Sequence, residues 1–78
     1  MERNAQDEIR AHLMATSEEF RKLAAEHSTF AQQLDSLEAL PHLTEQEQIE
    51  ETRIKKLKLR LKDQMEAMIH DYRHHQVA

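Results

Sequence analysis

The sequence predicts an all-α fold, an antiparallel two-helix hairpin of the coiled-coil type that assembles into a helical bundle. Ala, Glu, Lys, Leu and Arg supply 40 of the 78 residues, a composition typical of long helices. Glycine is absent and proline occurs once, so the tight turns of sheet proteins lack their usual residues. Apolar residues recur at helical spacing along two segments, and these segments define the two helices.

The first helix is predicted over about residues 4–39. One stripe of residues follows alternating spacings of four and three, the heptad pattern of a coiled-coil seam. The stripe consists of Ile9, Leu13, Thr16, Phe20, Leu23, His27, Phe30, Leu34 and Leu37. Thr16 and Glu19 have the spacing of a capping box, with Thr16 as the N-cap. Because the stripe keeps its phase there, we expect a kink or a brief break at residues 15–17 rather than a reversal.

A turn is predicted at residues 40–44, where Pro41 ends the first helix. Thr44 and Glu47 form a second capping box, so the second helix runs over about residues 45–74. Its apolar face consists of Ile54, Leu57, Leu61, Met65, Met68 and Tyr72. Because the connection is short and the helices have similar lengths, they should pair antiparallel, and residues 1–78 form a single hairpin module.

Several apolar residues lie outside both stripes, and they predict self-association. They are Met14, Leu40, Leu43, Ile49, Leu59 and Ile69. A lone hairpin of this size has a thin core, which leaves it marginally stable. A two-fold dimer that packs hairpins into a four-helix bundle would cover several of these residues. We therefore expect a homo-oligomer, a dimer or higher, with Leu59 at or near the contact; another helical protein could also serve as a partner.

Three segments carry a family resemblance: Ser17–His27, Leu34–Glu38 and, most specifically, the basic stretch Ile54–Asp63. They resemble the YdcH-like family of small bacterial proteins, a domain of unknown function, and the resemblance covers about residues 7–69. That family often carries Asn-Pro before Phe20, a helix start that this sequence lacks, which favours a continuous first helix here. The resemblance implies a helical hairpin in a bacterial cytoplasm and carries no activity.

Charge is unevenly distributed along the chain. Residues 1–52 carry 12 acidic and 4 basic residues, whereas residues 53–78 carry 3 acidic and 7 basic residues. The candidate interaction residues lie in the basic half: Arg53, Lys55, Lys56, Lys58, Leu59, Arg60 and Lys62. Their cations could bind the phosphates of a nucleic acid. However, the net charge is −4 and no aromatic residue lies among them, so we favour a role in covering the seam and meeting acidic residues of the first helix.

The histidines and carboxylates do not predict a chemical site. Glu66, His70 and His74 share one helical face, but this face points to solvent near the chain end, so we expect no metal and no cofactor. His27, in the seam, is interpreted as a polar residue that sets the helix register, with a pH sensor as the alternative. Two helices form a ridge rather than a pocket, so no catalytic residue and no small-molecule substrate is predicted.

The sequence thus predicts a protein that is not an enzyme: a structural or protein–protein interaction module that self-associates. The alternative function is a weak nucleic-acid-binding accessory protein that uses the basic stretch 53–62. No apolar run approaches the roughly 20 residues of a membrane span, and the first fifteen residues lack the apolar core of a signal peptide. We therefore expect a cytoplasmic protein without membrane contact.

Overall fold

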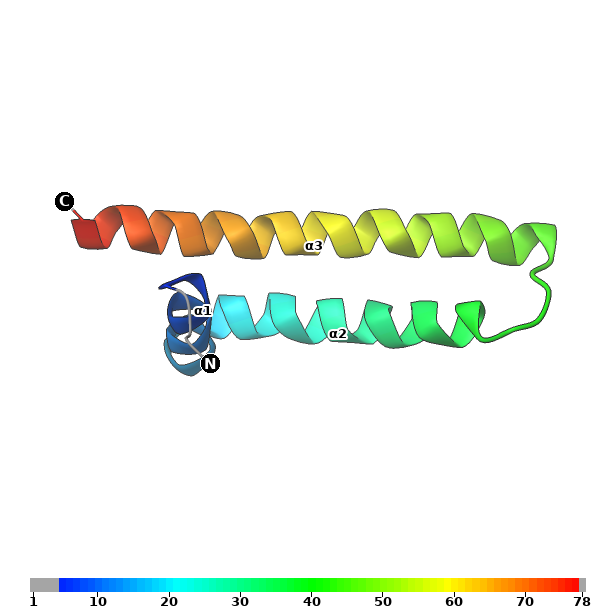
Figure 1. Ribbon diagram of the computed structural model, residues 1–78, viewed down its shortest axis with the longest axis horizontal. Coiled ribbons are helices and arrows are strands. Elements are labelled where there is room, and N and C mark those ends of the chain that lie inside the picture. Colours follow the sequence, from blue (N-terminus) through cyan, green and yellow to red (C-terminus); the bar gives the residue numbers. More distant parts are fainter. Residues whose placement is uncertain (1–4, 78) are drawn as a thin grey trace.

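The computed structural model describes the backbone of residues 5–77 and the side chains of residues 5–74, and this part of the chain is all-helical. It contains α1 (Ala5–Thr16), α2 (Glu18–Glu38) and α3 (Glu45–Val77). Helices α2 and α3 lie side by side and antiparallel, whereas α1 is seen nearly end-on beside the start of α2 (Figure 1). The molecule is elongated, with extents of 51 × 26 × 17 Å. The all-α prediction is confirmed.

The prediction of a single first helix is wrong, because the described chain has three helices rather than two. The break falls at residue 17, inside the range where a kink was expected. The change in helix direction at this break is larger than that of a kink. Helix α1 turns out of line with α2 instead of extending it (Figure 1). The predicted start at residue 4 lies outside the described residues. Helix α3 continues past the predicted end near residue 74 as far as Val77.

Ser17, not Thr16, caps α2 at its N-terminus. Ser17 has an extended backbone, with φ −112° and ψ 115°, and its hydroxyl accepts a hydrogen bond of 3.1 Å from the backbone N–H of Phe20. This is the ordinary geometry of a serine N-cap. Thr16 remains in α1, where its hydroxyl donates to the carbonyl oxygen of His12 at 2.9 Å. Serine and threonine are both common N-caps, so the sequence pattern alone did not distinguish Thr16 from the adjacent Ser17.

The end of α1 is closed by a side chain from α2. Nη1 of Arg21 donates to the carbonyl oxygens of Met14 and Ala15, at 3.1 and 3.3 Å. Carbonyls in the last turn of a helix have no partner within that helix, and a cation also suits the negative end of the helix dipole. Backbone groups on both sides of the break therefore have side-chain partners: carbonyls at the end of α1 accept from Arg21, and an N–H at the start of α2 donates to Ser17.

The turn and the start of α3 agree with the predicted local signals. Helix α2 ends at Glu38, shortly before Pro41. The hydroxyl of Thr44 accepts from the N–H of Glu47 at 3.1 Å, and the carboxylate of Glu47 accepts from the N–H of Thr44 at 2.9 Å. This reciprocal pair is a capping box, and it confirms that α3 begins at Glu45.

The core follows the two predicted stripes with two changes. Its buried side chains are Leu13, Phe20, Leu34, Ile54, Leu61, Met65 and Ile69. Thr16, which was assigned to the seam, is exposed. Ile69, which was assigned to the outside, is only 3% exposed because it joins the cluster of Leu13, Phe20 and Met65 beneath α1. The turn at Ser17 explains both changes, since it redirects α1 across α3.

Replacing Ser17 by Ala should destabilise the protein by about 0.5–2 kcal/mol, because the N–H of Phe20 loses its acceptor. For a domain of this size that corresponds to a fall in melting temperature of very roughly 4–8 °C per kcal/mol. Thermal unfolding followed by circular dichroism measures the change. The matched control is Thr16→Ala, which removes an adjacent hydroxyl that donates to the carbonyl oxygen of His12 and does not cap α2. Equal losses in the two variants would contradict the assignment of the cap to Ser17.

Candidate interaction surfaces

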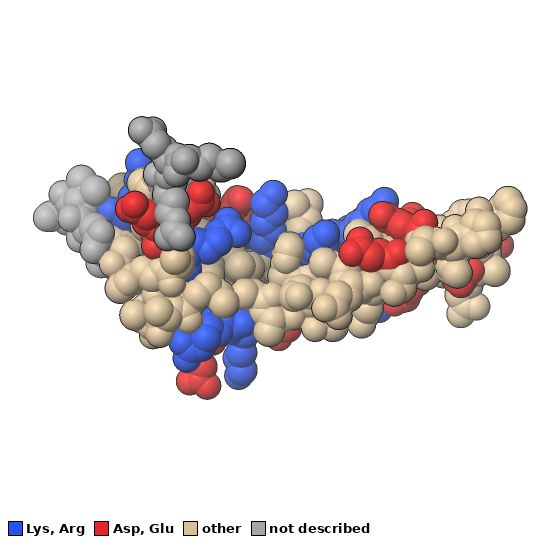
Figure 2. Space-filling model, turned by 60° about the horizontal axis from the view of Figure 1, so that its bottom comes forward, with Lys and Arg blue, Asp and Glu red and all other residues tan. Residues whose placement is uncertain are grey.

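The basic stretch of α3 does not form one strip in the structure. At about 100° per residue, Arg53 and Arg60 share one side of the helix, while Lys55, Lys58 and Lys62 share another. These three lysines border a groove with Leu59 of α3 and with His27 and Leu34 of α2. On the face that Figure 2 shows, Lys and Arg side chains are interspersed with Asp and Glu. A single phosphate backbone could not contact all of these cations at once.

Two cations of the basic stretch form ion pairs with nearby acidic side chains. Arg53 pairs with Glu50 one turn earlier, and this hydrogen-bonded ion pair lowers the pKa of the Glu50 carboxyl and raises that of Arg53. Lys55 lies 3.8 Å from a carboxylate oxygen of Glu51 and 4.0 Å from one of Glu38 in α2. The contact with Glu38 is the kind of pairing between acidic and basic halves that the charge distribution predicted. All of these groups are solvent-exposed enough for the pairs to add little stability.

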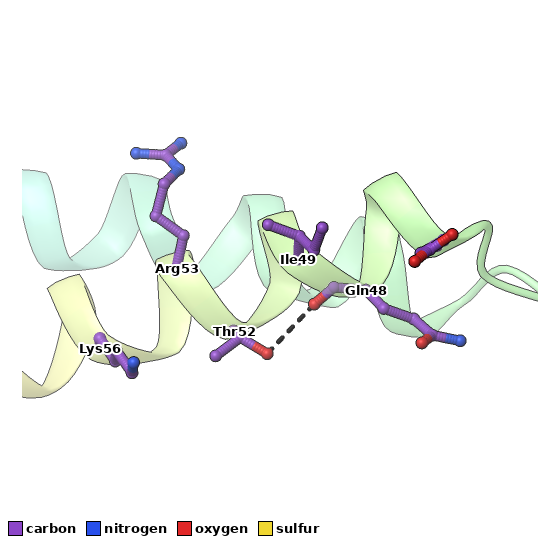
Figure 3. A pocket seen from close by; sticks show the side chains of 6 residues that line it. Gln48, Ile49, Thr52, Arg53 and Lys56 are labelled. Carbon is purple, nitrogen blue, oxygen red and sulfur yellow. Dashed lines mark hydrogen bonds between the residues drawn. The ribbon is translucent and has the colours of Figure 1, made fainter.

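The side of α3 that faces away from α2 carries exposed apolar residues. Ile49, Thr52, Lys56 and Leu59 follow spacings of three, four and three, and we call them the outer stripe. Ile49 is 65% exposed and Leu59 is 59% exposed. Three residues of the stripe, Ile49, Thr52 and Lys56, border an open hollow on α3 together with Arg53 (Figure 3). Within it, the Thr52 hydroxyl donates to the carbonyl oxygen of Gln48 at 3.1 Å.

The three helices meet around a second cavity, of about 280 Å³, which we call the junction cavity. It is lined by Arg10 of α1, His27 of α2, and Lys58, Lys62 and Met65 of α3. His27 is partly buried here, at the edge of the core rather than inside it. Burial lowers the pKa of the His27 imidazole below its ordinary value, and the nearby cations Lys58, Lys62 and Arg10 lower it further.

The junction cavity combines predicted and unpredicted residues. Lys58 and Lys62 were among the candidate interaction residues, and His27 was singled out as a polar seam residue. Arg10 was missed, because a straight first helix would have carried it away from the middle of α3. The signal that could have placed it was Ser17, a second N-cap candidate beside Thr16.

Among the side chains that the structure describes, the other histidines form no larger cluster. The rings of His70 and His74 stack at a centroid distance of 5.4 Å, and the ring of His12 lies 5.0 Å from that of Tyr72, joining α1 to α3. Among the described residues, no group of three or more His, Asp or Glu side chains is arranged to hold a metal ion. None of the described helices is both long and apolar enough to cross a bilayer.

These features define a small all-helical protein built on an antiparallel helix pair, with a third helix across one end. A family model described as "Protein of unknown function (DUF465)" matches residues 20–69, and the chain belongs to this family. The match covers most of α2, the turn and most of α3, whereas α1 lies outside it. Comparison with curated proteins and comparison with solved structures gave no match.

His27 should make the protein less stable as the pH falls below about 6.5. Its pKa is lower in the folded state than in the unfolded chain, so the unfolded state takes up the proton first and stability declines until the folded pKa is also passed. In His27→Gln this contribution disappears. The free energy of unfolding, measured by urea denaturation at about pH 7.5 and about pH 5.5, should fall less in the variant than in the wild type.

The control for this experiment is His42→Gln, which removes an exposed histidine from the turn between α2 and α3. Its pH dependence should match that of the wild type. If His27→Gln loses as much stability on acidification as the wild type, burial and the three cations do not lower the pKa of the His27 ring.

Proposed function

We propose that this protein is a non-catalytic interaction module that self-associates through the outer stripe of α3. The observation that carries the proposal is the exposure of Leu59. Its side chain is 59% exposed in the middle of the longest helix, between Lys58 and Arg60. An isolated exposed leucine needs no explanation, but this one continues a helical stripe with Ile49, which is 65% exposed.

The spacing of the outer stripe supports a helix as its partner. Spacings of three and four place Ile49, Thr52, Lys56 and Leu59 on one side of α3, the arrangement through which helices pack against each other. Each lies on the side opposite to residues such as Ile54 and Leu61, which are buried against α2. A second helix can therefore be added to this side without disturbing the existing core.

Charge complementarity favours a second copy of the chain as that helix. The stripe continues past Leu59 to the exposed acidic residues Asp63 and Glu66, again at spacings of four and three. If two α3 helices cross antiparallel at Leu59, Lys56 of one copy lies beside Asp63 of the other, and the reverse pair forms by symmetry. The apolar residue thus lies on the two-fold axis between two pairs of opposite charges.

The thin core adds an energetic reason for association. Helices α2 and α3 bury one stripe each, and a chain of 78 residues with a single core is marginally stable. Pairing two hairpins through the outer stripe would place the two α3 helices side by side, with an α2 helix on the far side of each, and would remove Leu59 from water. The burial of one leucine side chain contributes about 1.5–3 kcal/mol.

The proposal extends to the cellular setting. We propose that the protein is a YdcH-like member of its family and acts in the bacterial cytoplasm. The family match spans the segments Leu34–Glu38 and Ile54–Asp63, which carry that resemblance.

Replacing Leu59 by Glu should shift the protein from dimer to monomer, because the substitution buries two unpaired carboxylates on the two-fold axis. We expect the dissociation constant to rise by about tenfold or more, since the cost exceeds about 1.4 kcal/mol. Sedimentation equilibrium at tens of micromolar measures the mass of both proteins. The control is Leu40→Glu, which makes the same change at an exposed leucine in the turn.

The charge pairs provide a second arm of the same experiment. Lys56→Glu should weaken association, and Lys56→Glu combined with Asp63→Lys should restore it, because the double variant reverses both pairs. A wild type that sediments as a monomer at these concentrations would contradict self-association. A dimer that Leu59→Glu leaves intact would retain the oligomer but reject the outer stripe. Retention of the wild type on DNA or RNA at low salt, lost steeply as salt is added, would favour the nucleic-acid function instead.

A further inference from the structure

The junction cavity brings together cations from helices that are distant in sequence. Arg10, Lys58 and Lys62 line the same space of about 280 Å³, with His27 between α1 and α3. We propose that the junction cavity is a binding site for a small anion of the phosphate type. No residue that lines the cavity belongs to the outer stripe, although Leu59 borders the adjoining groove with His27, Lys58 and Lys62. The two proposals are tested with different variants and different measurements, so either one can fail without the other.

Among the described side chains, the cations of the junction cavity form no ion pair with an acidic residue. Within the described part of the chain, no carboxylate oxygen lies within 4.0 Å of Arg10, Lys58 or Lys62, whereas Arg53 and Lys55 of the same protein do have such partners. Three cations that converge on one space repel each other, and repulsion of this kind is relieved by an anion bound between them.

The electrostatic field at His27 gives independent support. The three cations all act to lower the pKa of the His27 imidazole, and burial, which is the largest cause, acts in the same direction. An anion in the cavity would oppose the cations and allow the ring to take up a proton. His27 would then add a fourth donor, so that the ligand receives hydrogen bonds from all three helices.

The chemistry of the cavity favours a tetrahedral anion. The cavity volume of about 280 Å³ has room for such an anion together with water. Arginine offers a planar fork of N–H donors and lysine a point charge, which are the two groups that proteins use for phosphate oxygens. The apolar wall is the Met65 side chain, which belongs to the core and limits the depth of the site.

The test uses inorganic phosphate as the probe, with sodium chloride at equal ionic strength as the reference, on the full chain. Two-dimensional NMR should show saturable shifts at Arg10, His27, Lys58 and Lys62, and thermal unfolding should show a higher melting temperature in phosphate than in chloride. Arg10→Gln and Lys62→Gln should each weaken binding by about tenfold or more, as expected when one charge-assisted hydrogen bond is lost. Lys22→Gln, a change at an exposed lysine on α2, should bind as the wild type does.

A second probe, sulfate, separates the titration of the ligand from that of the protein, because sulfate keeps its charge near neutral pH. Saturation with sulfate should raise the pKa of His27, measured by NMR, relative to chloride, whereas sulfate should leave the NMR signals of the exposed His42 ring in place. Shifts that do not saturate, or that persist equally in Arg10→Gln and Lys62→Gln, would overturn the proposal. It would also be overturned if single-stranded DNA bound more tightly than phosphate and lost affinity equally on Lys56→Gln, since the occupant would then be a nucleic acid.

Discussion

The Phe20 ring is completely buried, and the arrangement of all three helices depends on where it lies. It is the third residue after the Ser17 cap and joins Leu13 of α1 with Met65 and Ile69 of α3 in one cluster. An aromatic side chain is the largest single apolar contribution available to a core this small. Because the chain turns at Ser17, one ring can be covered by α1 from one direction and by α3 from another.

This turn determines both candidate surfaces. Helix α1 covers the part of α3 around Ile69 and brings Arg10 to Lys58 and Lys62, which creates the junction cavity. It leaves uncovered the side of α3 on which Leu59 lies. The same packing therefore gathers positive charge at one place and leaves an apolar stripe at another, which are the features that a ligand and a second copy respectively would neutralise or bury.

The local signals in the sequence were sufficient for most of the fold. The capping box at Thr44 and Glu47 marked the start of α3, Pro41 marked the end of α2, and the 3–4 spacing identified Leu34 and Ile54 as core residues. These predictions succeeded because caps and helical periodicity depend on residues within one or two turns. The exposed state of Leu59 was predictable for the same reason.

The direction of α1 was not predictable from periodicity. The heptad pattern runs through Thr16 without a change of phase, so the spacing of the apolar residues fits a straight helix as well as a broken one. Tertiary contacts determine the direction of α1. In the turned arrangement α1 packs against Ile69 and its last carbonyls accept hydrogen bonds from Arg21, contacts that a straight α1 would not have. For this reason Ile69 was assigned to the surface and the contribution of Arg10 to the junction cavity was missed.

The central claim is that the Phe20 ring holds α1 across α3, and nuclear Overhauser effects from that ring test it most directly. In a protein with selectively protonated Phe and methyl groups, the Phe20 ring should show cross-peaks to Leu13 of α1 and to Met65 or Ile69 of α3. The amide connectivities of helix should be interrupted at Ser17, where the backbone is extended. Unbroken helical connectivities from residue 13 to residue 20, without a cross-peak to Ile69, would contradict the account.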